Sequence, residues 1–137
     1  MIIKICGIQN KNTLICCEKN NVNFFGMIFY PASPRNISIQ NATELQKISE
    51  DLNIKGVGVF VNKHLYEVEK IIKNLKLRFV QLHGIEDDDY IKNLKQTGVK
   101  IIKSISISNK NDLRKIVKYK NVDYFLFDYK PLRGELP

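Results

Sequence analysis

Six short apolar runs, separated by helix-like segments, restrict the fold of this 137-residue chain more than any other feature. Most runs begin about 21–23 residues after the previous one, and each is rich in Val, Ile, Leu or Phe. Such runs are typical of strands buried on both faces of a parallel sheet. Strict alternation with helices predicts parallel strands joined by right-handed crossovers. The expected strands are Ile2–Cys6, Phe24–Phe29, Gly56–Val61, Leu77–Leu82, Lys100–Ser104 and Asp123–Asp128.

The segments between the runs carry signals for helix starts. Asn41 lies three residues before Glu44, which suits an N-cap with its capping-box partner. Asn62 and Asn109 stand where two later helices should begin, and the acidic run 87–89 suits the first turn of another. We therefore expect a β-α unit to repeat along the whole chain, in one domain spanning residues 1–137.

Charge and hydropathy exclude two classes of partner. The net charge is +8, but the lysines are scattered and no basic run alternates with aromatic residues, so we expect no nucleic-acid partner. A positive field can still attract a phosphorylated small molecule. No stretch approaches the roughly 18–20 apolar residues that a membrane span requires, so we expect no membrane partner.

The cysteines and histidines argue against structural metal. The chain has three cysteines without a CxxC pair, and two histidines, so neither a disulfide framework nor a zinc site is indicated. Free thiols fit a reducing compartment, and the apolar N-terminus is too short for a signal peptide. We expect a cytoplasmic protein with no bound metal.

Parallel α/β sheets bind ligands at the carboxyl ends of their strands, whether the sheet is open and doubly wound or closed as a (β/α)8 barrel. Periodicity alone leaves both architectures open. In either one, polar residues at the strand ends are the candidates for chemistry. They are Cys6, Ser33, Arg35, Asn62, His83, Ser104 and Asp128.

Motifs at these positions resemble the phosphoribosylanthranilate isomerase family. They fall in the family's order over nearly the whole chain, and together they favour the TIM-barrel form of the α/β class, with about six β/α units present. The matching segments are Lys4–Ile8, Gly26–Arg35, Val57–Asn62, Val80–Gly84 with Glu86, and Phe125–Asp128.

The resemblance implies an enzyme of tryptophan biosynthesis. Its reaction, an Amadori rearrangement, is an intramolecular oxidoreduction that converts N-(5-phosphoribosyl)anthranilate to 1-(2-carboxyphenylamino)-1-deoxyribulose 5-phosphate without a cofactor. The resemblance makes Cys6 the general base. Lys4 could favour its thiolate or, equally well, be the structural partner of a buried carboxylate. Asp128 corresponds to the general acid, a role that burial at a dry barrel mouth would favour.

Two further residues correspond to substrate contacts. Arg35 matches the residue that grips the anthranilate carboxylate, a task suited to a planar guanidinium. His83 lies at the barrel mouth, where a substrate contact and a structural hydrogen bond are equally consistent with the sequence. Without the family motifs, Cys6 could be a small buried hydrophobe and Asp128 a helix cap.

Three alternatives stay open at this point. Another phosphate-binding barrel, such as an indole-glycerol-phosphate synthase, would need a catalytic lysine pair in place of the N-terminal cysteine. A basic binding module would need clustered charge. The third is a truncated, catalytically incompetent barrel fragment, because the family carries two more β/α units than this chain. Exposed strand edges favour pairing with other chains, so we expect the chain alone to be a poor catalyst prone to self-association.

Overall fold

The computed structural model describes residues 1–129, and in them six parallel strands form one sheet in the order β1-β2-β3-β4-β5-β6. Because the strands are parallel and in sequential order, each helical segment lies in the connection between two adjacent strands. The strands are β1 (Lys4–Cys6), β2 (Phe24–Ile28), β3 (Lys55–Phe60), β4 (Phe79–Leu82), β5 (Lys100–Ile107) and β6 (Tyr124–Tyr129). All six expected strands are confirmed, each beginning within two residues of its expected start.

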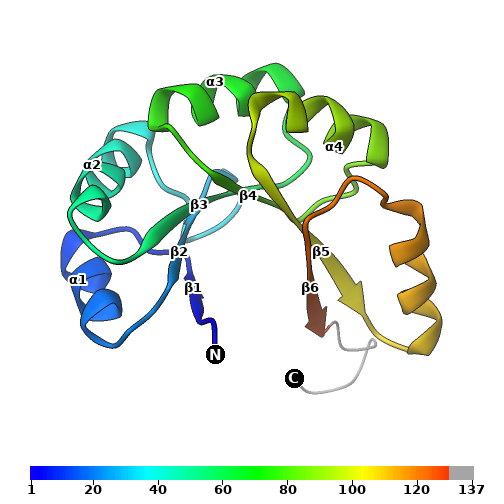
Figure 1. Ribbon diagram of the computed structural model, residues 1–137, viewed down its shortest axis with the longest axis horizontal. Coiled ribbons are helices and arrows are strands. Elements are labelled where there is room, and N and C mark those ends of the chain that lie inside the picture. Colours follow the sequence, from blue (N-terminus) through cyan, green and yellow to red (C-terminus); the bar gives the residue numbers. More distant parts are fainter. Residues whose placement is uncertain (130–137) are drawn as a thin grey trace.

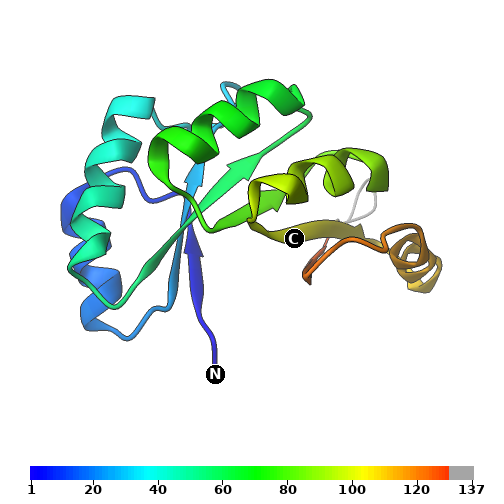
Figure 2. The same ribbon diagram turned by 45° about the horizontal axis from the view of Figure 1, so that its top comes forward.

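The sheet curves, and the helices lie on its convex side (Figures 1 and 2). They are α1 (Lys11–Lys19), α2 (Ile39–Glu50), α3 (Leu65–Leu75), α4 (Asp88–Leu94) and the 3-10 helices η1 (Lys95–Thr97) and η2 (Lys110–Lys118). This arrangement is that of an open (β/α) barrel, not of a doubly wound sheet, which carries helices on both faces. No helix in residues 1–129 is long and apolar enough to cross a membrane.

The hydrophobic core fills the layer between the sheet and the helices. Its largest fully buried apolar side chains come from the helix-facing side of the strands and from the helices themselves. They are Phe25, Phe60, Leu14, Met27, Leu82, Ile91, Leu94, Ile101, Val68 and Val80. Because this layer is dry and well packed, the ends of the strands are held in fixed positions on the concave side.

Two helix starts differ from the sequence-based expectation. Helix α2 begins earlier, because the Ser38 hydroxyl accepts a hydrogen bond from the Asn41 N–H, so Asn41 lies inside the first turn. Asn62 is not the cap of α3, which begins after His64. Instead, Asn62 has a left-handed backbone (φ 49°), and its Oδ1 accepts a 2.7 Å hydrogen bond from the Ile85 N–H. Asn62 therefore bonds a residue distant in sequence instead of capping the helix that follows it, as the local pattern had predicted.

The other two helix starts are as expected. Asp87 caps α4 by accepting a hydrogen bond from the Tyr90 N–H at 2.8 Å. Asn109 and Asp112 form a complete capping box at the start of the segment after β5. That segment is the 3-10 helix η2, which has no buried residue, so little tertiary packing favours the α-helical form.

A buried ion pair joins the loops at the carboxyl ends of β3 and β4. Lys103 and Glu86 have side chains 1% and 2% exposed, with Nζ and Oε2 3.1 Å apart. The Glu86 carboxylate also accepts hydrogen bonds from the N–H groups of Asn62 and Gly84, and the Lys103 ammonium donates to the carbonyls of Leu82 and Gly84. The pair therefore fixes the backbone on both sides of His83.

Removing either partner should strongly destabilise the fold, because the other charge would stay buried without compensation. We expect Glu86→Gln and Lys103→Met each to lower the free energy of unfolding by about 3–5 kcal/mol, measured by urea denaturation. The matched control is Glu67→Gln, which breaks the solvent-exposed Lys63–Glu67 pair and should cost less than about 1 kcal/mol. Equal losses in the buried and exposed variants would contradict this assignment.

Candidate functional site

The four predicted site residues, Cys6, Arg35, His83 and Asp128, line one cleft of about 420 Å³ at the carboxyl ends of the strands. They come from β1, the loop after β2, the end of β4 and β6, so only the curvature of the sheet brings them together. Of the other strand-end candidates, Ser33 lines the same cleft, whereas Asn62 lies outside it. A cleft lined by a thiol, a carboxylate, an imidazole and a guanidinium can move protons and hold an anion.

Cys6 and Lys4 lie on the same side of β1, as their two-residue spacing predicts. Cys6 pairs in register with Gly26 of β2. A methyl group built at Gly26 would lie 2.7 Å from the Cys6 Sγ and 3.2 Å from the Lys4 Nζ. The missing side chain of Gly26 therefore leaves the room in which the thiol and the ammonium group sit. Sequence reasoning had not assigned Gly26 to the site, because only the pairing register shows which residue faces Cys6.

Arg35 is anchored to the end of β1. Its Nη1 donates a 2.9 Å hydrogen bond to the carbonyl of Cys6, and its side chain crosses Gly7, whose φ is +85°. A side chain at Gly7 would collide with the Arg35 Cδ at 2.6 Å, so glycine is required there by both space and backbone conformation. This contact holds the guanidinium group beside the thiol while leaving its other donors for a ligand.

His83 and Asp128 approach each other across the cleft, with His83 Nε2 and Asp128 Oδ2 3.5 Å apart. Their side chains are 36% and 54% exposed. The burial that would favour Asp128 as a general acid is therefore not supplied by residues 1–129 alone. The inner face of β6 has neighbours on the β5 side only in residues 1–129, and water reaches the carboxylate.

Gln81 is a second site residue that sequence reasoning missed. It is 2% exposed, lines the cleft, and places its amide between Ser104 and His83. The signal was present in the sequence, since Gln81 is a polar residue inside the apolar run of β4, on the same face as His83 two residues later. Ser104, a strand-end candidate, reaches the site through this amide.

Asp123 holds the beginning of β6, the strand that carries Asp128. Its carboxylate accepts hydrogen bonds from the Ile101 N–H at 2.9 Å and from the ammonium groups of Lys100 and Lys95, both at 3.1 Å. Burial raises the pKa of Asp123. The three donors together lower this pKa by more than burial raises it, so the net pKa lies below its ordinary value of 3.8. The charged form of Asp123 is therefore the form that the fold stabilises.

A lowered pKa in the folded state makes the contribution of Asp123 dependent on pH. Its stabilisation is complete above the unfolded value near 3.8 and is lost as the pH falls through the lower folded value. We expect Asp123→Asn to reduce stability at neutral pH and to flatten the loss of stability as the pH falls below about 3.8, measured by urea denaturation at each pH. Glu44→Gln, on the exposed surface of α2, should leave the acid profile unchanged. Parallel profiles for Asp123→Asn and the unmodified chain would contradict the assignment.

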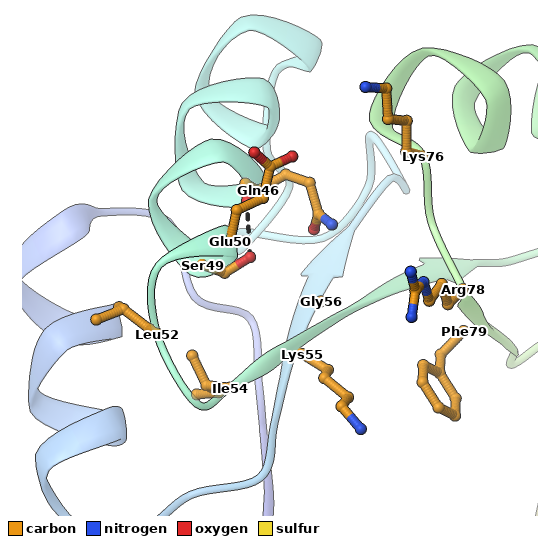
Figure 3. Close-up of a pocket in the computed structure, with 10 residues that line it drawn as sticks. All are labelled: Gln46, Ser49, Glu50, Leu52, Ile54, Lys55, Gly56, Lys76, Arg78 and Phe79. Carbon is orange, nitrogen blue, oxygen red and sulfur yellow. Dashed lines mark hydrogen bonds between the residues drawn. The ribbon is translucent and has the colours of Figure 1, made fainter.

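A second cleft, of about 350 Å³, lies at the opposite ends of β3 and β4 (Figure 3). Lys55, Lys76 and Arg78 line it, but the side chains of Lys55 and Lys76 point away from each other. The Ser49 hydroxyl donates a 2.7 Å hydrogen bond to the carbonyl of Gln46 on one wall. None of the residues predicted to carry chemistry lies there, and in barrels this end of the strands serves stability.

Comparison with known proteins decides the family. The model of the N-(5'-phosphoribosyl)anthranilate (PRA) isomerase family matches residues 3–135. This chain belongs to the PRA isomerase family. A PRA isomerase from Petrotoga mobilis is 41% identical over 129 residues, covering 93% of this chain and 60% of that protein. A Clostridium acetobutylicum PRA isomerase is 36% identical over 126 residues, covering 92% of this chain and 59% of that protein.

Solved PRA isomerase structures share the fold. The Thermotoga maritima enzyme superposes with a TM-score of 0.88 at 28% identity, over 96% of this chain and 63% of that one. A PRA isomerase in complex with reduced 1-(o-carboxyphenylamino)-1-deoxyribulose 5-phosphate gives 0.84 at 30% identity, over 95% and 66%. The chain thus spans about 60% of the length of its curated PRA isomerase relatives.

Proposed function

We propose that the protein containing this chain is a PRA isomerase of tryptophan biosynthesis. It would convert N-(5-phosphoribosyl)anthranilate to 1-(2-carboxyphenylamino)-1-deoxyribulose 5-phosphate. The observation that carries the proposal is that a thiol and a carboxylate from the first and sixth strands line one cleft in a chain of this family. The complex of a relative with the reduced form of that product supports a phosphorylated small molecule as the substrate.

The two residues divide the proton transfers between them. Asp128 gives a proton to the ribose ring oxygen, and the ring opens as the nitrogen lone pair forms a C=N bond to carbon 1. Cys6, as thiolate, then removes the proton from carbon 2, giving an enolamine that tautomerises to the ketone. Substrate and product contain the same atoms, and the reaction as written uses no cofactor. The acid acts on the ring oxygen and the base on the proton of carbon 2, both attached to carbon 1 of one sugar, which requires the shared cleft.

Arg35 and His83 contact the substrate in this proposal. The free donors of the Arg35 guanidinium bind the anthranilate carboxylate, and its bond to the Cys6 carbonyl anchors it to the strand end that carries the thiol. His83 faces the acid at 3.5 Å and lines the same cleft. The net charge of +8 assists encounter with the anionic substrate.

The setting of the enzyme follows from its family and its free thiols. Cys6, Cys16 and Cys17 are free thiols, which supports a reducing, cytoplasmic location. We further propose that residues 1–137 belong to a single barrel domain, with small molecules as its partners rather than nucleic acid or membrane. The outer edges of β1 and β6 have no neighbouring strand in the described residues, which supports self-association of this chain through them.

Loss of either proton-transfer group should abolish turnover. We expect Cys6→Ser and Asp128→Asn each to lower kcat by at least about 100-fold, as for removal of a general acid or base. The assay follows the fluorescence of the anthranilate group. It uses the 137-residue chain and the same chain joined in frame to the part of the Petrotoga mobilis relative outside the match.

Cys16→Ser is the matched control, because Cys16 is an exposed thiol on α1, outside the cleft. It should keep full activity. If Cys6→Ser or Asp128→Asn kept normal turnover, that residue would lose its assigned role. If the joined protein carrying the unmodified residues were inactive, the isomerase proposal itself would be refuted.

Arg35 should act mainly on binding. Arg35→Lys keeps the positive charge but loses the planar fork that pairs with a carboxylate, so we expect KM to rise about 10-fold with a smaller change in kcat. Steady-state kinetics on the joined protein measure both constants. Arg78→Lys, in the cleft at the other end of the strands, is the matched control and should leave KM unchanged. A fall in kcat at constant KM for Arg35→Lys would place Arg35 in the chemical step instead.

A further inference from the structure

We propose that Gln81 is a positioning residue, which fixes His83 as the tautomer whose Nε2–H points at the Asp128 carboxylate. The inference concerns a residue to which the proposed function gives no role, and its catalytic consequence rests on that function. It is carried by a chain of contacts across the inner face of three adjacent strands. The chain runs from Ser104 on β5, through Gln81 on β4, to His83 and then to Asp128 on β6.

The amide of Gln81 has two hydrogens and two acceptors within reach. Its Nε2 lies 3.1 Å from the Ser104 Oγ and 3.3 Å from the His83 Nδ1. Gln81 and Ser104 are 2% and 6% exposed, so water does not compete for these positions. With Nε2 donating to both, the His83 Nδ1 must be an acceptor and carry no proton. A neutral imidazole has one N–H, which then resides on Nε2.

In this orientation of the amide, the Gln81 oxygen is left without a hydrogen bond from residues 1–129. Among the described residues, the Gln81 Oε1 is buried and has no hydrogen-bond partner. The reverse orientation would put Oε1 toward Ser104 and His83 and place the His83 proton on Nδ1, so Nε2 would face Asp128 as an acceptor. The two orientations therefore predict opposite tautomers of His83, and the tautomer can be measured.

The Nε2–H tautomer suits an acid that must lose its proton. His83 Nε2 faces Oδ2 of Asp128, which leaves Oδ1 to carry the proton toward the ribose ring oxygen. As that proton leaves, negative charge develops on the carboxylate, and the imidazole N–H stabilises it through a charge-assisted hydrogen bond. The distance of 3.5 Å is at the outer limit for such a bond, and catalytic contacts commonly shorten when substrate is bound. Gln81 acts through His83 and does not itself touch the reacting atoms.

Nitrogen NMR of the 15N-labelled chain of 137 residues tests the tautomer directly. The chain has only two histidines, His64 and His83, so His64→Gln assigns both sets of ring signals. The spectra are recorded at about pH 8, where an ordinary imidazole is neutral. We expect the proton of His83 to reside on Nε2. A His83 proton on Nδ1 in the unmodified chain would overturn the inference, and this reading needs no substitution at the site.

Gln81→Glu tests the causal step. A carboxylate can only accept, so the His83 proton should move to Nδ1, a loss of the Nε2–H form that a purely structural role of Gln81 would not produce. Gln46→Glu is the matched control, because Gln46 lies on α2 at the opposite cleft and should leave the His83 signals unchanged. Unchanged His83 signals in folded Gln81→Glu would overturn the inference. If that variant failed to fold, the His83 tautomer measured in the unmodified chain would still support or overturn the inference.

Activity separates this inference from the proposed function. In the joined protein we expect Gln81→Glu to lower kcat about 10-fold or more, with little change in KM, since charge stabilisation in the transition state is lost. An Nε2–H tautomer in a joined protein without isomerase activity would refute the function and leave the Gln81–His83 assignment standing. An Nδ1–H tautomer in an active enzyme would refute the Gln81–His83 assignment and leave the proposed function standing. Unaltered kcat in folded Gln81→Glu would remove the catalytic consequence assigned to Gln81.

Discussion

The two-residue period of parallel strands determines where every functional group of this protein lies. Adjacent residues Lys103 and Ser104 of β5 show this most clearly. Lys103 points toward the helices and pairs with Glu86, whereas Ser104 points to the concave face and contacts Gln81. A shift of one residue in the pairing of β4 with β5 would exchange these faces, placing an ammonium group in the cleft and a hydroxyl in the core. The apolar outer layer therefore fixes the register that the polar inner face requires.

Polar groups are buried on both sides of this sheet, and the Lys103–Glu86 pair and Gln81 differ in how fully they are satisfied. On the helix side, the Glu86 carboxylate and the Lys103 ammonium satisfy each other and also several backbone groups of the loops beside His83. On the concave side, Gln81 leaves one buried acceptor without a partner among the described residues. The fully satisfied pair suits a structural role, whereas the acceptor of Gln81 left unpaired in residues 1–129 lies in the cleft that holds the candidate site. The two networks meet in the loop of His83.

The sequence predicted the six strands and the candidate site well because both depend on local pattern, whereas the choice of a barrel over an open sheet came from the family motifs. Apolar runs of strand length mark buried strands, and residues at their carboxyl ends converge in any parallel sheet, so Cys6, Arg35, His83 and Asp128 could be assigned to one region. Contacts between residues distant in sequence were beyond that reasoning. Asn62 bonds the loop after β4 instead of capping α3, and Gly26 faces Cys6 only through the register of β1 with β2. The exposure of Asp128 likewise depends on which strands flank β6.

Under the proposed function, binding of the substrate changes the surroundings of the Asp128 carboxylate. In the described residues 54% of that side chain is open to water. A sugar bound between Cys6 and Asp128 would displace this water, since both residues line the same cleft. Removing water makes a charged carboxylate more costly and strengthens every remaining hydrogen bond to it. The tautomer of His83 then matters most in the covered site, because a single aligned N–H is the group that can replace the lost water as the charge develops.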